Sequence, residues 1–233
     1  MMICQLKKPY ISVSNGSSCS YGGNQMCSTN QTERSVGCGA VAALDLFLFL
    51  CRSHLSPEHP VNKNLFPSNW PMEQQQYLSL LHDFRKKYFP LIPGHGINGV
   101  SLAIGVNAFF IKNRIPFIAI WGVPYAKLWS SIRQMLDQDI PVIFSVGPNF
   151  PFFWQHHQLR FYVQRSDGAY IPGPQTHAHY VTITGMDEQW LQIASWGRKY
   201  YINRAEYLSY VREHSIHLVS NILYIRKKGH GVS

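Results

Sequence analysis

The chain has 233 residues, with 21 Lys and Arg against 12 Asp and Glu, so its formal net charge is +9. Hydrophobic residues make up 45% of the chain and charged residues 14%, which excludes an intrinsically disordered protein. The longest apolar run, residues 41–51, is interrupted by Asp45 and is much shorter than the roughly 20 residues that cross a bilayer. The sequence therefore predicts a folded protein without a membrane anchor.

No secretory signal is recognisable at the N-terminus, because the first 20 residues lack an apolar stretch ahead of a small-residue cleavage site. The prediction is therefore a cytoplasmic protein. The basic residues are scattered in short groups, which favours a solvated surface over nucleic-acid binding. An odd number of cysteines without a C-x-x-C pair indicates neither a complete disulfide framework nor a zinc site: Cys4, Cys19, Cys27, Cys38 and Cys51.

Apolar spacing predicts helices over most of the first 140 residues, at 38–52, 72–88, 100–113 and 125–137. Alternating β-branched and aromatic residues predict strands that dominate the last 90 residues. The strand ranges are 117–120, 141–146, 160–164, 179–185, 190–195, 199–202 and 217–225. A capping box at 203–206 predicts a further helix from Arg204 to about His214.

Helices followed by an antiparallel sheet predict an α+β fold with a cleft between the two halves. We expect residues 1–20 to form a poorly ordered N-terminal segment and residues 21–233 to form a single domain.

Cys38 begins the first predicted helix, between Gly37 and Gly39. The unpaired N–H groups and the positive dipole end of a helix N-terminus stabilise a thiolate, so the sequence predicts a lowered pKa and a nucleophilic Cys38. A small core cysteine is the alternative interpretation.

His179 begins one predicted strand, and Ser195 ends the next strand along the chain. Antiparallel pairing of these two strands places the start of the first beside the end of the second, so His179 and Ser195 become neighbours. An imidazole held in this way can take a proton from a thiol and later protonate a leaving amine. His177, two residues away, is the rival candidate for this base.

In these features the chain resembles the papain-like cysteine peptidases, most closely the branch that processes the double-glycine leaders of bacteriocins. The motifs are Gly37-Cys38-Gly39 at a helix start, an I-P-V-I strand entry at residues 140–143, and His179 heading H-x-V-x-x-x-G. The resemblance covers roughly residues 21–225. It implies a papain-like fold, with an N-terminal helical lobe packed on a C-terminal twisted antiparallel sheet.

The resemblance also implies roles for single residues. The family places an Asp or Asn sixteen residues after the histidine, and this position is Ser195 here, within Ala194-Ser195-Trp196-Gly197. A hydroxyl is a weaker partner for an imidazole than a carboxylate. The family's oxyanion-hole glutamine has two candidates: Gln31, and Gln25 if residues 26–34 form an inserted loop.

The function implied is cleavage of a peptide or amide bond in a peptide or protein substrate, with no cofactor and no metal. Two alternatives remain: a catalytically weak or inactive domain that binds a peptide, and an acyltransferase that uses the same cysteine.

Overall fold

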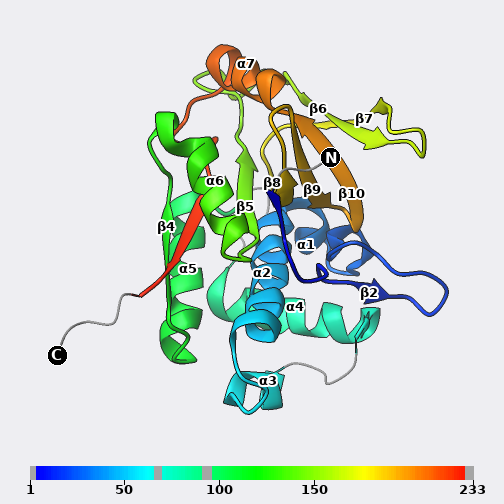
Figure 1. Cartoon of the computed structure of the whole chain (residues 1–233), viewed down its shortest axis with the longest axis vertical. Coiled ribbons are helices and arrows are strands. Elements are labelled where there is room, and N and C mark those ends of the chain that lie inside the picture. The colour runs from blue at the N-terminus through cyan, green and yellow to red at the C-terminus, as the bar shows by residue number, and fades with distance from the viewer. Residues whose placement is uncertain (1–3, 66–69, 91–95, 229–233) are drawn as a thin grey trace.

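The computed structural model describes residues 4–65, 70–90 and 96–228, and of residues 63–65 the backbone alone. It has an α+β fold, as the sequence predicts (Figure 1). The helices are α1 (Gln31–Val36), α2 (Cys38–His54), α3 (Pro60–Leu65), α4 (Gln74–Tyr88), α5 (Gly99–Lys112), α6 (Leu128–Asp137) and α7 (Arg204–His214), with short 3-10 helices η1 (Gln25–Cys27) and η2 (Tyr125–Lys127). The strands are β1 (Cys4–Gln5), β2 (Val13–Ser14), β3 (Met72–Glu73), β4 (Phe117–Trp121), β5 (Val142–Val146), β6 (Leu159–Gln164), β7 (Tyr170–Thr176), β8 (His179–Met186), β9 (Trp190–Ser195), β10 (Arg198–Asn203) and β11 (Leu223–Lys227).

The main sheet has the strand order β1-β8-β9-β10-β6-β7, and β5 also pairs with β8. All of its strand pairs are antiparallel. β5 and β1 share one edge of β8, and β9 takes the other edge. This central position explains why seven of the eight residues of β8 are buried.

The helix α2 forms the centre of the helical part. Every residue from Gly39 to Cys51 is buried, because α2 contacts β8 and β5 of the sheet as well as α4 and α5. A helix that is apolar on all sides belongs in a protein core. In Figure 1, α2 lies between the sheet and the helices α3 and α4 at the bottom of the view. No helix in the described ranges is long and apolar enough to span a membrane.

Most predicted elements are confirmed within one or two residues, but some are not. The strand predicted at 217–225 exists only from Leu223, because the chain before it turns, with the Ser220 N–H donating to the Ile216 carbonyl. The helix predicted at 125–137 is α-helical only from Leu128, since residues 125–127 form the 3-10 helix η2, and residues 72 and 73, predicted as helix, form β3. β7 was not predicted, since two prolines and a glycine interrupt its alternation.

Residues 4–20 are part of the packed structure, contrary to our expectation of a poorly ordered segment. β1 pairs with the end of β8, with Cys4 opposite Met186, and Ile11 is completely buried. The Lys7 N–H donates a hydrogen bond of 2.8 Å to the Asp139 carboxylate. The segment closes the edge of the sheet that β5 leaves uncovered, so its backbone groups find partners there.

Candidate active site

The junction between α1 and α2 places Cys38 against the sheet. Gly37 ends α1 and also precedes the first residue of α2. A Cβ at Gly37 would lie 2.2 Å from the Glu33 carbonyl oxygen, and a Cβ at Gly39 would lie 3.2 Å from the Tyr180 ring. The two glycines therefore allow the start of α2 to approach both α1 and β8 closely.

His179 begins β8, opposite Val146 of β5, and it is buried. Its Nε2 lies 2.8 Å from the Ser195 Oγ at the end of β9. The prediction that antiparallel pairing makes His179 and Ser195 neighbours is therefore confirmed. Since Nε2 is taken by Ser195, Nδ1 is the ring nitrogen left for chemistry.

Trp196 covers the imidazole from one side. The two rings stack, with centroids 4.5 Å apart and an interplanar angle of 15°. Trp196 and Gly197 form the two-residue turn between β9 and β10, with φ angles of 48° and 72°. Left-handed angles suit Asn and Gly in such a turn, and they cost a residue with a Cβ about 1 kcal/mol. A tryptophan in this conformation is a strained position, of the kind found at functional sites, and here its ring covers His179.

One small cavity connects the predicted site residues. Its volume is about 20 Å³, enough for about one water molecule. Within the described residues, no hydrogen bond joins the Cys38 thiol to His179. Both residues nevertheless line this cavity. The lining residues include Gln25, Cys38, Asp45, His179, Ser195 and Trp196.

The structure separates the two candidate glutamines. Gln25 is buried and lines the cavity, and its Nε2 donates a hydrogen bond of 3.0 Å to the Arg34 carbonyl. Gln31 is exposed in the first turn of α1 and does not line the cavity. The segment between Gln25 and Cys38, which would be an inserted loop if Gln25 takes the oxyanion role, contains the end of η1 and the short helix α1.

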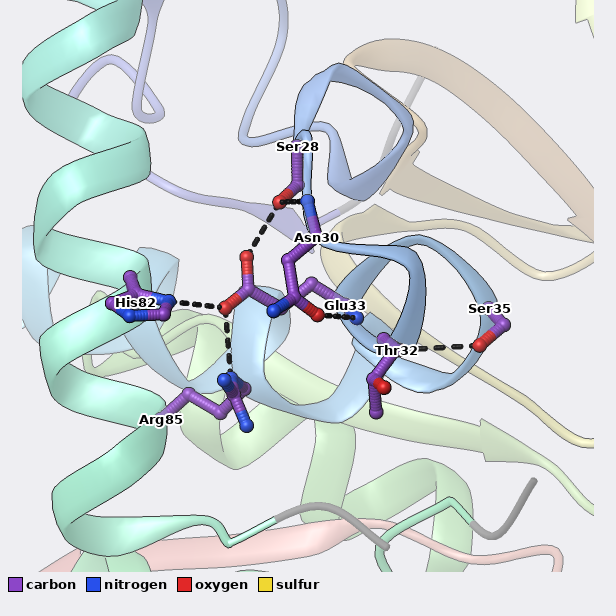
Figure 2. Close-up of polar contacts among 7 residues, drawn as sticks. All are labelled: Ser28, Asn30, Thr32, Glu33, Ser35, His82 and Arg85. Atoms are coloured by element: carbon purple, nitrogen blue, oxygen red, sulfur yellow. Dashed lines mark hydrogen bonds and ion pairs between the residues drawn. The ribbon is translucent and has the colours of Figure 1, made fainter. Parts of the chain in front are cut away.

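A buried Glu33 attaches α1 to α4 (Figure 2). Its carboxylate accepts hydrogen bonds from Arg85 Nε at 2.8 Å and Ser28 Oγ at 2.5 Å, and lies 2.9 Å from His82 Nδ1. The side chain of Glu33 is 3% exposed. Since the Arg34 carbonyl holds the Gln25 amide, the contacts of Glu33 also fix the position of Gln25.

Asp45 holds the segment that precedes Gln25 in the chain. One carboxylate oxygen accepts the Gly23 N–H at 2.9 Å, and the other accepts the Tyr77 hydroxyl at 2.7 Å. The Tyr10 hydroxyl adds a third bond at 3.3 Å. These bonds tie the segment before Gln25 to α2. Asp45 lines the cavity, but its hydrogen-bond partners do not include His179.

Burial sets the protonation of the Cys38 and His179 side chains. It raises the pKa of the Cys38 thiol, although the backbone N–H groups of Tyr180 and Gly39 lower it. It lowers the pKa of His179 to about 4. The predicted lowering of the Cys38 pKa is therefore wrong, because loss of hydration outweighs the N–H groups at the helix start. Both side chains are therefore neutral at pH 7.

The other candidates lie away from this cavity. His177 lies in the bend between β7 and β8, with its ring 5.7 Å from that of His156, and it does not line the cavity. In the described part of the chain, no three His, Cys, Asp or Glu side chains are grouped as a metal site would require. Phe152, Phe153 and Trp154 are exposed in the loop after β5.

The sequence analysis missed the supporting residues of the site. Asp45 was visible as the one charge within the longest apolar run, and a charge in a core helix indicates a buried polar partner. Nothing in the spacing of Glu33, His82 and Arg85 indicated that they meet, since the two helices that carry them are far apart in the chain.

Comparisons with protein-family models, with curated proteins and with solved structures find no match to this chain. The functional interpretation therefore depends on the resemblance in sequence motifs and on the geometry of this site.

Proposed function

We propose that the chain is a papain-like cysteine hydrolase that cleaves a peptide or amide bond. The observation that carries the proposal is the shared cavity of Cys38, His179, Ser195 and Gln25, with His179 Nε2 bonded to Ser195. These residues come from η1, the start of α2, the start of β8 and the end of β9. A nucleophile, a base and an oxyanion donor in one cavity are the minimum set for acyl transfer from an amide.

In the proposed reaction, His179 Nδ1 takes the proton of the Cys38 thiol while Sγ bonds to the substrate carbonyl carbon. The Gln25 amide and the Cys38 backbone N–H stabilise the oxyanion. The C–N bond then breaks, and the imidazolium returns its proton to the leaving amine. Water, activated by His179, hydrolyses the thioester and regenerates the thiol.

Ser195 has a defined role in this scheme. Nδ1 can accept a proton only if Nε2 carries the ring hydrogen. In that tautomer Nε2 donates a hydrogen bond to Ser195 Oγ. A hydroxyl can also donate, so Ser195 selects this tautomer less strictly than a carboxylate would. Loss of this hydrogen bond in Ser195→Ala should lower the rate about tenfold, which corresponds to about 1.4 kcal/mol.

The test is digestion of a peptide library derived from a whole proteome, with new termini identified by mass spectrometry. We expect cleavage by the native protein and a loss of at least about hundredfold in Cys38→Ser and His179→Ala. His217→Ala is the matched control, since His217 packs against the Tyr125 ring and does not line the cavity. Absence of cleavage by the native protein, or equal cleavage by Cys38→Ser, would overturn the proposal.

A second candidate function is a peptide-binding domain that has lost catalysis. The neutral state of both Cys38 and His179 at pH 7 and the hydroxyl at position 195 favour it. It predicts that a bound peptide is recovered intact after long incubation and that Cys38→Ala binds that peptide equally well. Recovery of a cleaved peptide from the native protein decides for the hydrolase.

A further inference from the structure

A second, larger pocket lies next to the candidate active site, and we name it the Trp196 groove. Its volume is about 320 Å³, sixteen times that of the cavity beside Cys38. Trp196, whose ring stacks on His179, lines both. The residues that line the groove are Val13, Asn15, Ser18, Cys19, Ser20, Asn24, Cys27, Gln74, Tyr77, Leu78, Trp196, Gly197 and Arg198.

Two segments that are hydrogen-bonded through their backbones line both the groove and the cavity. The Tyr21 N–H donates to the Gly197 carbonyl at 2.8 Å, and the Gly197 N–H donates to the Gly23 carbonyl at 3.0 Å. Asn24 lines the groove, and the next residue, Gln25, lines the cavity. The cavity and the groove are therefore lined by adjoining residues of the same two segments, 20–25 and 195–198.

The charge among the lining residues of the groove is positive. Arg198 is its only charged lining residue, and no Asp or Glu lines it. Arg198 is exposed, and within the described ranges its guanidinium has no hydrogen bond or ion pair. The other polar groups of the groove are amides and hydroxyls, such as those of Asn24, Gln74 and Ser18. A guanidinium with free donors is suited to bind a carboxylate in a bidentate manner.

We propose that the Trp196 groove is a substrate subsite that takes an acidic residue of the peptide, bound by Arg198. This inference deepens the proposed function and rests on it. The site then has a small cavity for the reacting bond and a polar, positively charged groove that selects the flanking sequence. The net charge of +9 favours the same class of substrate.

The first experiment is the peptide-library digestion with Arg198→Gln and Arg198→Glu. An exposed ion pair contributes at most about 1 kcal/mol, so the native protein should prefer acidic residues at one position by about two- to fivefold. Arg198→Gln should abolish the preference, and Arg198→Glu should reverse it towards Lys and Arg. Arg226→Gln is the matched control, an exposed arginine on β11 outside the groove.

The second experiment needs no turnover. In the Cys38→Ser variant, alkylation of Cys19 and Cys27 by iodoacetamide reports on the groove that both residues line, while Cys4 and Cys51 are buried and serve as internal controls. A Glu-rich decapeptide should slow the alkylation by about two- to fivefold relative to a Gln-rich decapeptide. The Arg198→Glu variant should lose this protection.

The outcomes separate the two proposals. Cleavage without an acidic preference, or equal protection by the two decapeptides, overturns the subsite while the hydrolase proposal stands. Protection by the Glu-rich peptide alone, in a protein that cleaves nothing, supports the subsite and overturns the hydrolase in favour of the peptide-binding domain.

Discussion

Two buried carboxylates hold the chain on either side of Gln25, and they differ in what compensates their charge. Glu33, on the short helix α1, contacts Arg85, His82 and Ser28. Burial raises its pKa, but these hydrogen bonds outweigh the burial, so the pKa of Glu33 lies below its ordinary value. Asp45 has only neutral donors, and burial raises its pKa to about 6.

The difference shows that hydrogen bonds alone do not make burial of a charge favourable. Asp45 accepts three of them, and its pKa still lies above the ordinary value, because tyrosine hydroxyls and one N–H replace only part of its hydration. Glu33 has an arginine beside it and stays ionised. The two supports of the candidate oxyanion glutamine should therefore respond in opposite ways to pH and to mutation.

The largest expected effect is that of Glu33→Ala. Removal of one partner leaves Arg85, whose side chain is 12% exposed, without its counter-charge, and should lower the free energy of unfolding by roughly 3 kcal/mol. Urea unfolding at pH 7 measures this change. Glu188→Ala, at an exposed position, should change stability by less than about 0.5 kcal/mol. Equal effects of the two variants would show that the Glu33 cluster does not stabilise the fold.

The next largest effect concerns how the difference in stability between the native protein and Asp45→Asn depends on pH. The folded-state pKa of Asp45, about 6, lies above its ordinary value of 3.8, so its contribution to stability is complete below pH 4 and is lost as the pH rises through 6. The stability of the native protein relative to Asp45→Asn should fall by about 2 kcal/mol between pH 4 and pH 7.5.

The Glu33→Gln variant should show the opposite sign in the same measurement. The folded-state pKa of Glu33 is lowered, so its contribution is present above the unfolded-state pKa and is lost as the pH falls through the folded-state pKa. If both variants follow the same pH trend in urea titrations, the proposed difference between the two carboxylates is wrong.

A smaller effect is expected for Tyr77→Phe. The substitution removes the 2.7 Å hydrogen bond to Asp45 while the buried ring remains, and should cost about 1.5 kcal/mol at pH 7. Because that bond lowers the Asp45 pKa, the pH at which stability is lost should also move upward. A pH profile that is unchanged in Tyr77→Phe would show that Tyr77 does not control the carboxylate.

The smallest effect is that of His82→Ala. The His82 side chain is 39% exposed, so water screens its contact with Glu33, and the expected loss is about 0.5 kcal/mol. Thermal unfolding of His82→Ala beside Glu33→Ala measures the ratio of the two effects. A loss in His82→Ala as large as that in Glu33→Ala would show that the histidine, and not Arg85, compensates the carboxylate.

The local pattern of the sequence determined the α+β class, most helices and strands, and the meeting of His179 with Ser195. These features depend on short-range rules: apolar periodicity selects the element type, and antiparallel pairing of two consecutive strands sets the residues that face each other. The start of α2 at Cys38 followed in the same way from the glycines around it.

Only the tertiary structure decided that Gln25 and not Gln31 lines the cavity, how Asp45 and Glu33 hold the segments around Gln25, and the direction of the Cys38 pKa shift. Each depends on contacts between segments far apart in the chain, such as Glu33 with Arg85 and Cys38 with Tyr180. Burial of the thiol is set by how closely β8 packs on α2. A single helix start cannot reveal that loss of hydration, because hydration depends on all neighbours in space.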